Sequence, residues 1–453
     1  MKFRGGYTFK NFNGAAEPVF FEAPLPGKAA VSVKNVPGIF TVVVKSGDNV
    51  KAGQKIAESA DEIKTCIYAP VSGTVSNIDS DYIHIISDKS QSVNPVEGHT
   101  REPWHLSHSD ALELFCRTGC SLLLGKKYSG AGETENVKNI IINAVHNSPL
   151  GQKWTPEISG TAENLINGLK SLKSVFIKAE ITFAVNKRNR KFFDNPVFAE
   201  SAKTMVMKDR YPQENPEVLS LNILNKPLIS PEGKNDDSVI VLRYEDLILI
   251  SGVMTQGSPL IEKIVLLAGT GVSKPGWYRL RIGTTFGEIR KTFLKSEEFG
   301  PWRIIKGDPL SGKGVGSDEE SICFDDYEIS VITDKAERQL LQFVRPGFDS
   351  DSYSKSTVSN YVSLIPKKIE TNLHGGVRPC VQCNFCDEVC PVNLYPFLIW
   401  KNVEAELYDD CFRIRPYDCV ECGLCDYVCP SKISLLESVR KAKAEYRKSR
   451  EGK

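Results

Sequence analysis

The sequence predicts a multidomain chain of mixed α/β and β regions that ends in a helical, cysteine-rich domain. Three observations carry this expectation: short strands broken by glycine turns, then mixed helical and strand patterns, then one cysteine phrase written twice. We place the four predicted domains at residues 1–98, 99–255, 256–335 and 336–453.

Composition sets broad limits on what the chain does. Its 453 residues are 41% hydrophobic and 25% charged, which is typical of globular domains, and the formal net charge of +1 gives no field that would favour nucleic acid or an acidic partner. The N-terminus, MKFRGGYTFKNFNG, lacks the apolar core of a secretory signal. The longest apolar stretches, such as Leu247 to Met254, are far shorter than the ~18 to 20 residues of a membrane span. We therefore expect no transmembrane segment.

The N-terminal region alternates apolar residues with tight turns. VVVKSGDNVKAGQKIA (42–57) and IYAPVSGTVSNI (67–78) predict a flattened barrel-sandwich of short strands. The pattern resembles the biotinyl/lipoyl fold, in which a hairpin lysine carries the cofactor. Glu62 occupies the usual lysine position here and Lys64 follows two places later, so we expect a structural domain without a lipoyl or biotinyl arm.

The two central regions differ in their pattern. In 99–255, SHSDALELFCRTGC predicts a capped helix and NVKNIIINAVHNSP a buried strand, which together indicate a Rossmann-like α/β domain with ligands beyond the carboxyl ends of its strands. In 256–335, strand-like runs broken by Gly and Pro precede a helix that starts at Thr285. This order predicts a small β-grasp module of the SLBB type.

The doubled phrase is CVQCNFCDEVCP (380–391) and CVECGLCDYVCP (419–430). Three thiolates three residues apart on a turning loop can bind three corners of one [4Fe–4S] cube, whereas the fourth, before a proline, points toward the other cluster. The first predicted ligand set is Cys380, Cys383, Cys386 and Cys429. The second is Cys419, Cys422, Cys425 and Cys390. A ferredoxin-like domain with two clusters passes electrons between partners.

Zinc is the competing interpretation of these cysteines. A four-thiolate zinc site needs two C-x-x-C pairs only, and would leave the third and fourth cysteine of each phrase without a role. The five remaining cysteines are scattered, and we expect them to be buried: Cys66, Cys116, Cys120, Cys323 and Cys411. A zinc site of His105 and His108 with Cys116 and Cys120 is a weaker alternative to loop and cap roles for these histidines.

The segments around the phrases predict helices. Residues 393–409 carry apolar side chains at helical intervals, and Ser431 is the expected N-cap of a final helix. Gly375, Gly376 and Arg378 either donate hydrogen bonds to cluster sulfurs or form a plain linker. The basic end of the chain, 440–453, is either solvated or held at an anionic membrane surface.

This order of domains resembles two related subunit families. FRGGYTF and the barrel are similar to both the A subunit of the sodium-translocating NADH:quinone oxidoreductase and the C subunit of the Rnf complex. NAVHNSPLGQKWTPEISGTAENLINGLKSL and LAGTGVSKPGWYRLRIGTTFGEI resemble the A subunit, whereas the cysteine phrases resemble the Rnf subunit. The resemblance implies a peripheral electron-transfer subunit, on the cytoplasmic side, of an ion-translocating membrane complex that has integral-membrane partners. A soluble two-cluster adaptor for a cytosolic oxidoreductase is the rival class, and quinone as a partner stays open.

One departure separates this chain from flavin-binding relatives. Rnf C subunits carry a glycine-rich loop resembling GLGGAGFPT, which lets the backbone approach flavin and dinucleotide phosphates. Here the matching stretch after Gly119 is CSLLLGKKYSGAGE, with bulky Lys126, Lys127 and Tyr128 where glycines should cluster. NAVHNSP also offers no carboxylate on the flavin side. We therefore expect no FMN or NADH binding by this chain, against the alternative of an Rnf C-type dehydrogenase subunit.

Overall fold

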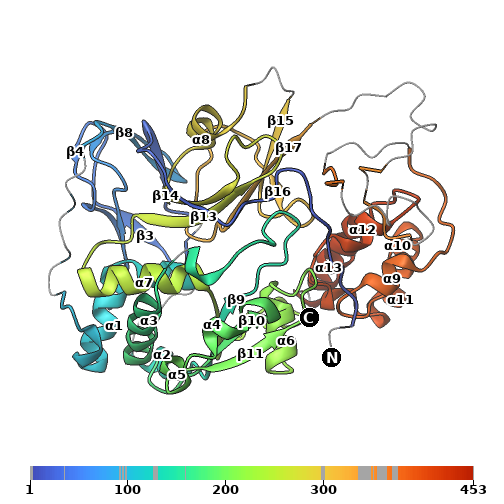
Figure 1. The fold of residues 1–453 in the computed structure, drawn as a ribbon, viewed down its shortest axis with the longest axis horizontal. Helices are drawn as coiled ribbons and strands as arrows, with labels where there is room; N and C mark the ends of the chain where they lie inside the picture. The colour runs from blue at the N-terminus through green and yellow to red at the C-terminus, as the bar shows by residue number, and fades with distance from the viewer. Residues whose placement is uncertain are drawn as a thin grey trace.

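A computed structural model describes most of the chain, in four parts that Figure 1 shows from blue to red along the sequence. The described residues are 4–34, 36–90, 93, 96, 99–125, 131–158, 160–296, 301–334, 348–349, 351–354, 365–369 and 376–451. No helix among them is both long enough and apolar enough to cross a membrane.

The N-terminal part is a barrel of two antiparallel sheets. One sheet has the order β2 (Lys28–Ser32), β8 (Tyr82–Ser87), β7 (Gly73–Ile78), β4 (Asn49–Val50). The other has the order β3 (Phe40–Val42), β5 (Lys55–Ser59), β6 (Cys66–Tyr68). Alternate side chains such as Val75, Ile83 and Ile85 are buried between the sheets, as the period of two predicts. In the β5–β6 connection, Lys64 forms an ion pair with Glu58 at 2.5 Å.

The second part is a four-stranded parallel sheet with helices on its faces, which confirms the predicted α/β layout. The strand order is β11 (Lys203–Met207), β10 (Glu180–Asn186), β9 (Asn139–Ala144), β12 (Val239–Arg243). Its longer helices are α1 (His108–Arg117), α3 (Ala162–Val175), α6 (Pro216–Ile223) and α7 (Tyr244–Gln256). Three short ones are α2 (Ala131–Glu135), α4 (Arg190–Phe193) and α5 (Pro196–Ala199).

The two faces of this sheet bury alternate residues of the same strand. Ile140 and Ile142 of β9 pack into the large core that contains α3 and α7. Ile141 packs on the opposite side with Leu219 of α6. Because both faces are covered, β9 reads as a continuous apolar run instead of an alternating one. At the start of α1, the Ser107 hydroxyl accepts a hydrogen bond from the Asp110 amide, as the capping signal predicts.

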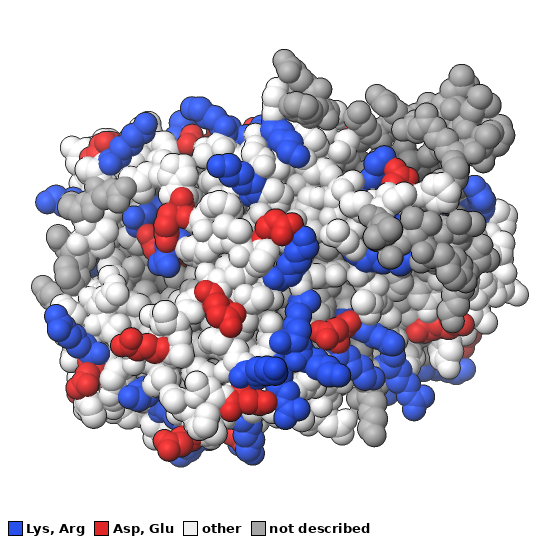
Figure 2. Space-filling model, in the orientation of Figure 1, with Lys and Arg blue, Asp and Glu red and all other residues white. Residues whose placement is uncertain are grey.

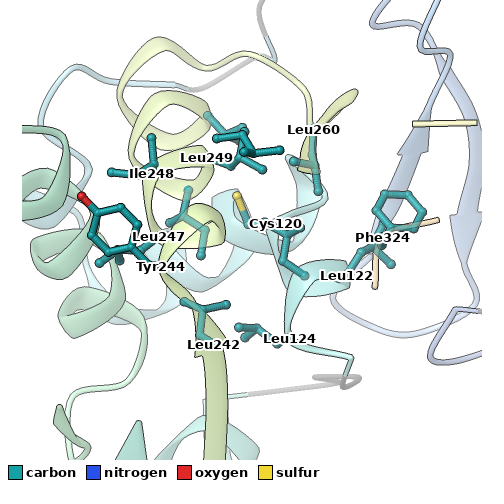
Figure 3. Close-up of a cluster of buried hydrophobic side chains, with 14 of the residues drawn as sticks. Cys120, Leu122, Leu124, Leu242, Tyr244, Leu247, Ile248, Leu249, Leu260 and Phe324 are labelled. Atoms are coloured by element: carbon teal, nitrogen blue, oxygen red, sulfur yellow. The ribbon is translucent and has the colours of Figure 1, made fainter. Parts of the chain in front are cut away.

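A 3₁₀ segment, η2 (Cys120–Leu124), connects the α/β layer to the neighbouring parts. Figure 3 shows Cys120 and Leu122 beside Leu242 and Leu247, with Phe324 approaching from the next domain. Burial in this apolar cluster raises the pKa of the Cys120 thiol to about 12. Cys120 therefore behaves as a neutral, hydrophobic core residue.

The third part is a mixed sheet covered by α8 (Phe286–Phe293), which begins after the Thr285 cap as predicted. The strand order is β1 (Phe20–Glu22), β14 (Gly276–Arg281), β13 (Glu262–Ala268), β17 (Glu328–Thr333), β15 (Trp302–Lys306), β16 (Lys313–Gly314). Strand β1 comes from the N-terminal region but pairs in parallel with β14. The first and third parts are therefore joined by a shared strand as well as by chain order.

The C-terminal part is helical. Its helices are α9 (Phe385–Val389), α10 (Pro396–Glu404), α11 (Tyr408–Arg413), α12 (Leu424–Val428) and α13 (Leu435–Glu451), and a 3₁₀ turn, η8 (Pro416–Asp418), precedes the second phrase. The expectation that Ser431 caps the last helix is wrong, because α13 begins at Leu435. The Ser431 hydroxyl instead donates to the carbonyl of Pro379 at 2.9 Å and ties the two phrases together.

A fully buried ion pair joins the α/β layer to the third sheet. Lys263 Nζ of β13 lies 2.6 Å from Asp246 Oδ1 of α7, and both side chains are inaccessible to solvent. The Tyr327 hydroxyl donates to the other carboxylate oxygen at 2.7 Å, and the Lys263 ammonium lies 3.9 Å from the Tyr327 ring centre. Burial raises the pKa of Asp246, against the lowering effect of Lys263. The pair is therefore stable only as a complete unit.

Removing one member of this pair should be costly. We expect Lys263→Met to lower the free energy of unfolding by about 3–5 kcal/mol, because Asp246 is left buried without its cation. The double variant Lys263→Met/Asp246→Leu should recover most of that loss, since it buries no charge. Urea denaturation of the three proteins measures both effects, and equal losses in the single and double variants would contradict the coupling.

Candidate iron–sulfur centre

Left-handed backbone turns shape both cysteine loops. In the first phrase, Gln382 and Asn384 have φ values of 54° and 61°. In the second, the equivalent residues Glu421 and Gly423 have φ values of 52° and 74°. Each pair of turns leads into a five-residue helix, α9 or α12. The repeat is thus one of backbone conformation as well as of sequence.

The two loops enclose two separate cavities. The first cavity is lined by four cysteines: Cys380, Cys383, Cys386 and Cys429. The second cavity is lined by the other four: Cys390, Cys419, Cys422 and Cys425. These groups are the two sets that the spacing predicts, with one cysteine exchanged between the phrases. Their proximity is an observation, whereas their binding of iron stays a prediction.

The chemistry of both cavities suits an iron–sulfur cluster. Apart from the thiols, the walls of both cavities are mainly apolar, with Phe397 and Ile433 in the first and Leu424 and Val439 in the second. Burial raises the pKa of the Cys386 and Cys419 thiols to about 12. Without iron these thiols are therefore neutral, and iron binding would replace their protons.

The spread of the sulfurs argues against a single zinc ion. With Zn–S bonds of about 2.3 Å, a tetrahedral site brings its sulfurs within roughly 4 Å of one another. Across the described part of the chain, only Cys323, Asp325 and Asp326 bring three metal-ligating atoms within 4.8 Å of one another. A cube separates its ligands because each thiolate binds a different iron. The Cys323 group already contains a cation, since Lys306 Nζ lies 3.4 Å from Asp326 and 3.9 Å from the Cys323 sulfur.

Backbone amides donate to sulfurs of the second cavity. The Leu394 N–H donates to Cys390 Sγ at 3.2 Å, and the Glu421 N–H donates to Cys419 Sγ at 3.3 Å. Such donors stabilise negative charge on sulfur and so favour the reduced state of a bound cluster. On the same side, Lys443 Nζ lies 3.0 Å from the Cys419 carbonyl oxygen.

The other candidate residues do not gather at the cavities. The five scattered cysteines are all buried, as predicted. The His108 ring lies 2.9 Å from the Val175 carbonyl and 3.2 Å from the Thr134 hydroxyl, which satisfies it without a metal. Arg378 has an exposed side chain, and its N–H donates to the Ser431 carbonyl at 2.9 Å. The prediction made for 126–128 falls outside the residues that the structure describes.

A third cavity, of about 760 Å³, lies at the carboxyl edge of the parallel sheet, where the α/β pattern predicts ligands, but its lining residues were not predicted. Arg243 at the end of β12 and Glu214 after β11 line one side, and Asp308 and Glu328 line the other. Only Arg243 and Glu214 could have been placed from strand ends, because Asp308 and Glu328 belong to the third sheet and its loops. Tyr211 connects this cavity to the second one, since its hydroxyl donates to the Cys422 carbonyl at 2.8 Å.

Groups of both charges line this third cavity, with Arg243, Lys306 and Lys313 among the cations. Burial raises the pKa of Glu214 to about 8 and that of Glu328 to about 8. Neither side-chain oxygen of Glu214 has a hydrogen-bond partner among the described residues. At neutral pH these groups are therefore largely protonated, and they disfavour an anionic ligand at higher pH.

Comparisons with known proteins agree with the resemblance drawn from the sequence. The chain is 25% identical over 426 residues to the A subunit of the Na(+)-translocating NADH-quinone reductase of Chlamydia pneumoniae, covering 90% of this chain and 87% of that protein. It is 24% identical to the Tolumonas auensis counterpart over 403 residues, or 87% of each chain. Over most of its length the chain is thus similar to these A subunits. Two stretches match domain families: 1–96 the RnfC barrel sandwich hybrid domain, and 379–433 the 4Fe-4S dicluster domain.

The predicted resemblance to both subunit families is therefore confirmed. Among solved structures, an NAD+-reducing [NiFe]-hydrogenase in the H2-reduced state matches with a TM-score of 0.38 and 12% identity, covering 77% of this chain and 65% of that one. Its air-oxidized form matches with a TM-score of 0.33 and 13% identity, covering 45% of this chain and 42% of that one. The dicluster family match supports iron–sulfur chemistry in 379–433.

Crossed ligation makes a specific prediction. Cys429→Ser should alter the same cluster as Cys380→Ser, because both residues line the first cavity although they lie in different phrases. Electron paramagnetic resonance (EPR) of the reduced proteins distinguishes the clusters, and wild-type protein purified without oxygen should hold about eight iron and eight sulfide per chain. Cys419→Ser is the control for the second cavity. A Cys429→Ser spectrum that matches this control would refute the crossed assignment.

Proposed function

We propose that this chain is a peripheral electron-transfer subunit of a membrane-bound, ion-translocating complex of the NADH:quinone oxidoreductase or Rnf type. It would carry electrons through two [4Fe–4S] clusters on the cytoplasmic side of the membrane. One observation carries the proposal: a chain similar to A subunits over most of its length places four cysteines around each of two neighbouring cavities. The clusters, when bound, supply the one-electron carriers.

The closeness of the two cavities supports a relay. Cys386 near the start of α9 lines the first cavity, and Cys390 at its end lines the second. In α12 the order is reversed, with Cys425 in the second cavity and Cys429 in the first. Four residues of helix rise only about 6 Å. Each short helix therefore bridges both cavities, and an electron would have a short path between them.

The surroundings distinguish the two ends of the relay. Val381 lines the first cavity and is 67% exposed. The second cavity is covered by other parts of the chain, and Tyr211 links it to the carboxyl-edge cavity. We infer that the first cluster faces an external redox partner and that the second faces inward. Quinone or another small electron carrier would have to approach the second cluster through the carboxyl-edge cavity.

The basic end of the chain agrees with a peripheral position. Figure 2 shows Lys and Arg side chains gathering on this face where the α/β layer meets the C-terminal helices. Part of the charge on α13 is compensated, because Arg440 and Lys443 pair with Glu421 at 2.8 and 2.5 Å. Basic residues beside an anionic leaflet contribute on the order of 1 kcal/mol each. These basic residues would thus add to the attachment of the chain to the membrane, which integral-membrane partners would mainly provide.

The carboxyl-edge cavity favours a second candidate, an Rnf C-type dehydrogenase subunit that binds NADH and FMN. Open α/β sheets bind ligands at this edge, and the volume is sufficient for a cofactor. Glu214 and Glu328 do not exclude it, because both are largely protonated at neutral pH and Arg243 lines the same cavity. The bulky Lys126, Lys127 and Tyr128, which stand where glycines should let the backbone approach the phosphates, argue against it. We therefore keep the relay without bound flavin as the proposal.

Membrane partners separate the proposal from a soluble adaptor. Affinity purification of the tagged chain from detergent-solubilised membranes should recover integral-membrane proteins in constant ratio to the chain. Cys380→Ser/Cys419→Ser protein is the control, because loss of electron transfer should leave docking through the other domains intact. Recovery of cytosolic dehydrogenases alone would favour the adaptor.

Cofactor content separates the proposal from the dehydrogenase. The isolated chain should contain no stoichiometric FMN, and NADH alone should leave the visible absorbance of its clusters unbleached. Dithionite should reduce the same clusters, since it needs no binding site. Tight FMN in the purified chain, or direct reduction by NADH, would reverse the choice.

A further inference from the structure

The N-terminal segment lies against the C-terminal part, next to the second cysteine cavity. In Figure 1 it runs beside the C-terminal helices, and the Gly6 N–H donates to the Val389 carbonyl at 2.8 Å. Tyr7 exchanges two backbone hydrogen bonds with Tyr211, at 3.0 and 2.9 Å. We call residues 4–7 the strap. It lies between the α/β layer and the loop that ends in Cys390.

Gly5 is the tightest point of this contact. A Cβ atom at this position would lie 2.4 Å from the carbonyl oxygens of both Val389 and Cys390. Real Cβ contacts are not this short, and both neighbours are backbone atoms that cannot rotate away. Any side chain at Gly5 must therefore move the strap or the segment that carries Cys390.

The same strap is connected to Cys422, another cysteine of the second cavity. Tyr211, which pairs with Tyr7, donates its hydroxyl hydrogen to the Cys422 carbonyl at 2.8 Å and lies 3.2 Å from Asp308. The next residue, Gly423, is closed in by the third sheet's loop, because a Cβ there would lie 2.4 Å from the Leu310 carbonyl oxygen. Cys390 and Cys422, which come from different phrases, are thus both held by contacts with the strap and Tyr211, outside the C-terminal part.

The first cavity has different neighbours in the described chain. The contacts along its edge come from within the C-terminal part, such as Arg378 N–H to the Ser431 carbonyl and the Ser431 hydroxyl to the Pro379 carbonyl. Gly376, near this cavity in sequence, has open space where its Cβ would be. The backbone contacts of the strap are therefore with the Cys390 end of α9, and its one approach to α12 among the described residues is the Tyr7 ring, whose centre lies 5.9 Å from that of Tyr427.

We propose that Gly5 and Tyr211 are positioning residues for the second iron–sulfur cluster. They hold the backbones of Cys390 and Cys422 at the separation that one cube requires. This inference rests on the proposed ligation and adds that the second cluster depends on a segment more than 380 residues away in sequence. The contact explains the glycine at position 5, and a left-handed φ of 84° explains the glycine at position 6.

Two substitutions test the strap in the full-length protein. Gly5→Ala should remove or shift the EPR signal of the second cluster, identified by its absence in Cys419→Ser, and change the first signal much less. Tyr211→Phe keeps the ring in place and should lower the midpoint potential of the second cluster alone, because a hydrogen bond that withdraws charge from Cys422 is lost. Gly376→Ala is the matched glycine control and should behave as wild type.

A measurement without iron keeps the two proposals apart. In chain prepared free of iron, Gly5→Ala should increase the alkylation rate of Cys390 and Cys422 several-fold, read by mass spectrometry, and leave Cys383 and Cys386 unchanged. Absence of iron from the wild-type protein would refute the relay. The alkylation rates would still test whether the strap positions Cys390 and Cys422. Equal damage to both clusters, or an unchanged second cluster with unchanged labelling, would overturn the strap.

Discussion

The left-handed turns at 382, 384, 421 and 423 are the constraint on which the rest of the C-terminal part depends. They place three thiols on one side of each loop, and they let the following helix carry its last cysteine to the other cavity. Each such residue without glycine costs roughly 1–2 kcal/mol, so the loops need external support. Neighbouring helices, the Ser431 bridge and the strap supply that support. The chain therefore stores strain where it would hold its clusters.

Local patterns were predicted well where the deciding interactions are short in sequence. The caps at Ser107 and Thr285 follow from hydroxyl groups that bond to amides three residues later. The cysteine grouping follows from the spacing. The first three cysteines of each phrase are three residues apart and point to one side of the loop, whereas the fourth comes four residues later and points to the other cavity. Ser431 failed as a cap because a distant carbonyl, that of Pro379, competes for its hydroxyl. A single sequence contains no signal for that competition.

Long-range assembly accounts for what the sequence could not show. Strand β1 leaves its own barrel for the third sheet, which no composition shift marks. The carboxyl-edge cavity draws Glu214 from one layer and Glu328 from another, and only the packing of the two brings them together. FRGGYTF resembles two subunit families, but the reason for Gly5 in it is the backbone of Val389 and Cys390. The features that could not be predicted are those whose interacting residues lie far apart in the sequence.

The strap also has a consequence for biosynthesis. Gly5 and Gly6 are made early, whereas their partners at the end of α9 emerge from the ribosome much later. At about 5–20 residues per second, translation separates Gly6 from Val389 by roughly 20–80 s. The N-terminal barrel can fold in that interval, while the strap has nothing to bind. Cluster insertion into the second cavity is thus coupled to synthesis of the C-terminal part, so that a chain cut short before α12 would not present a finished relay to its partners.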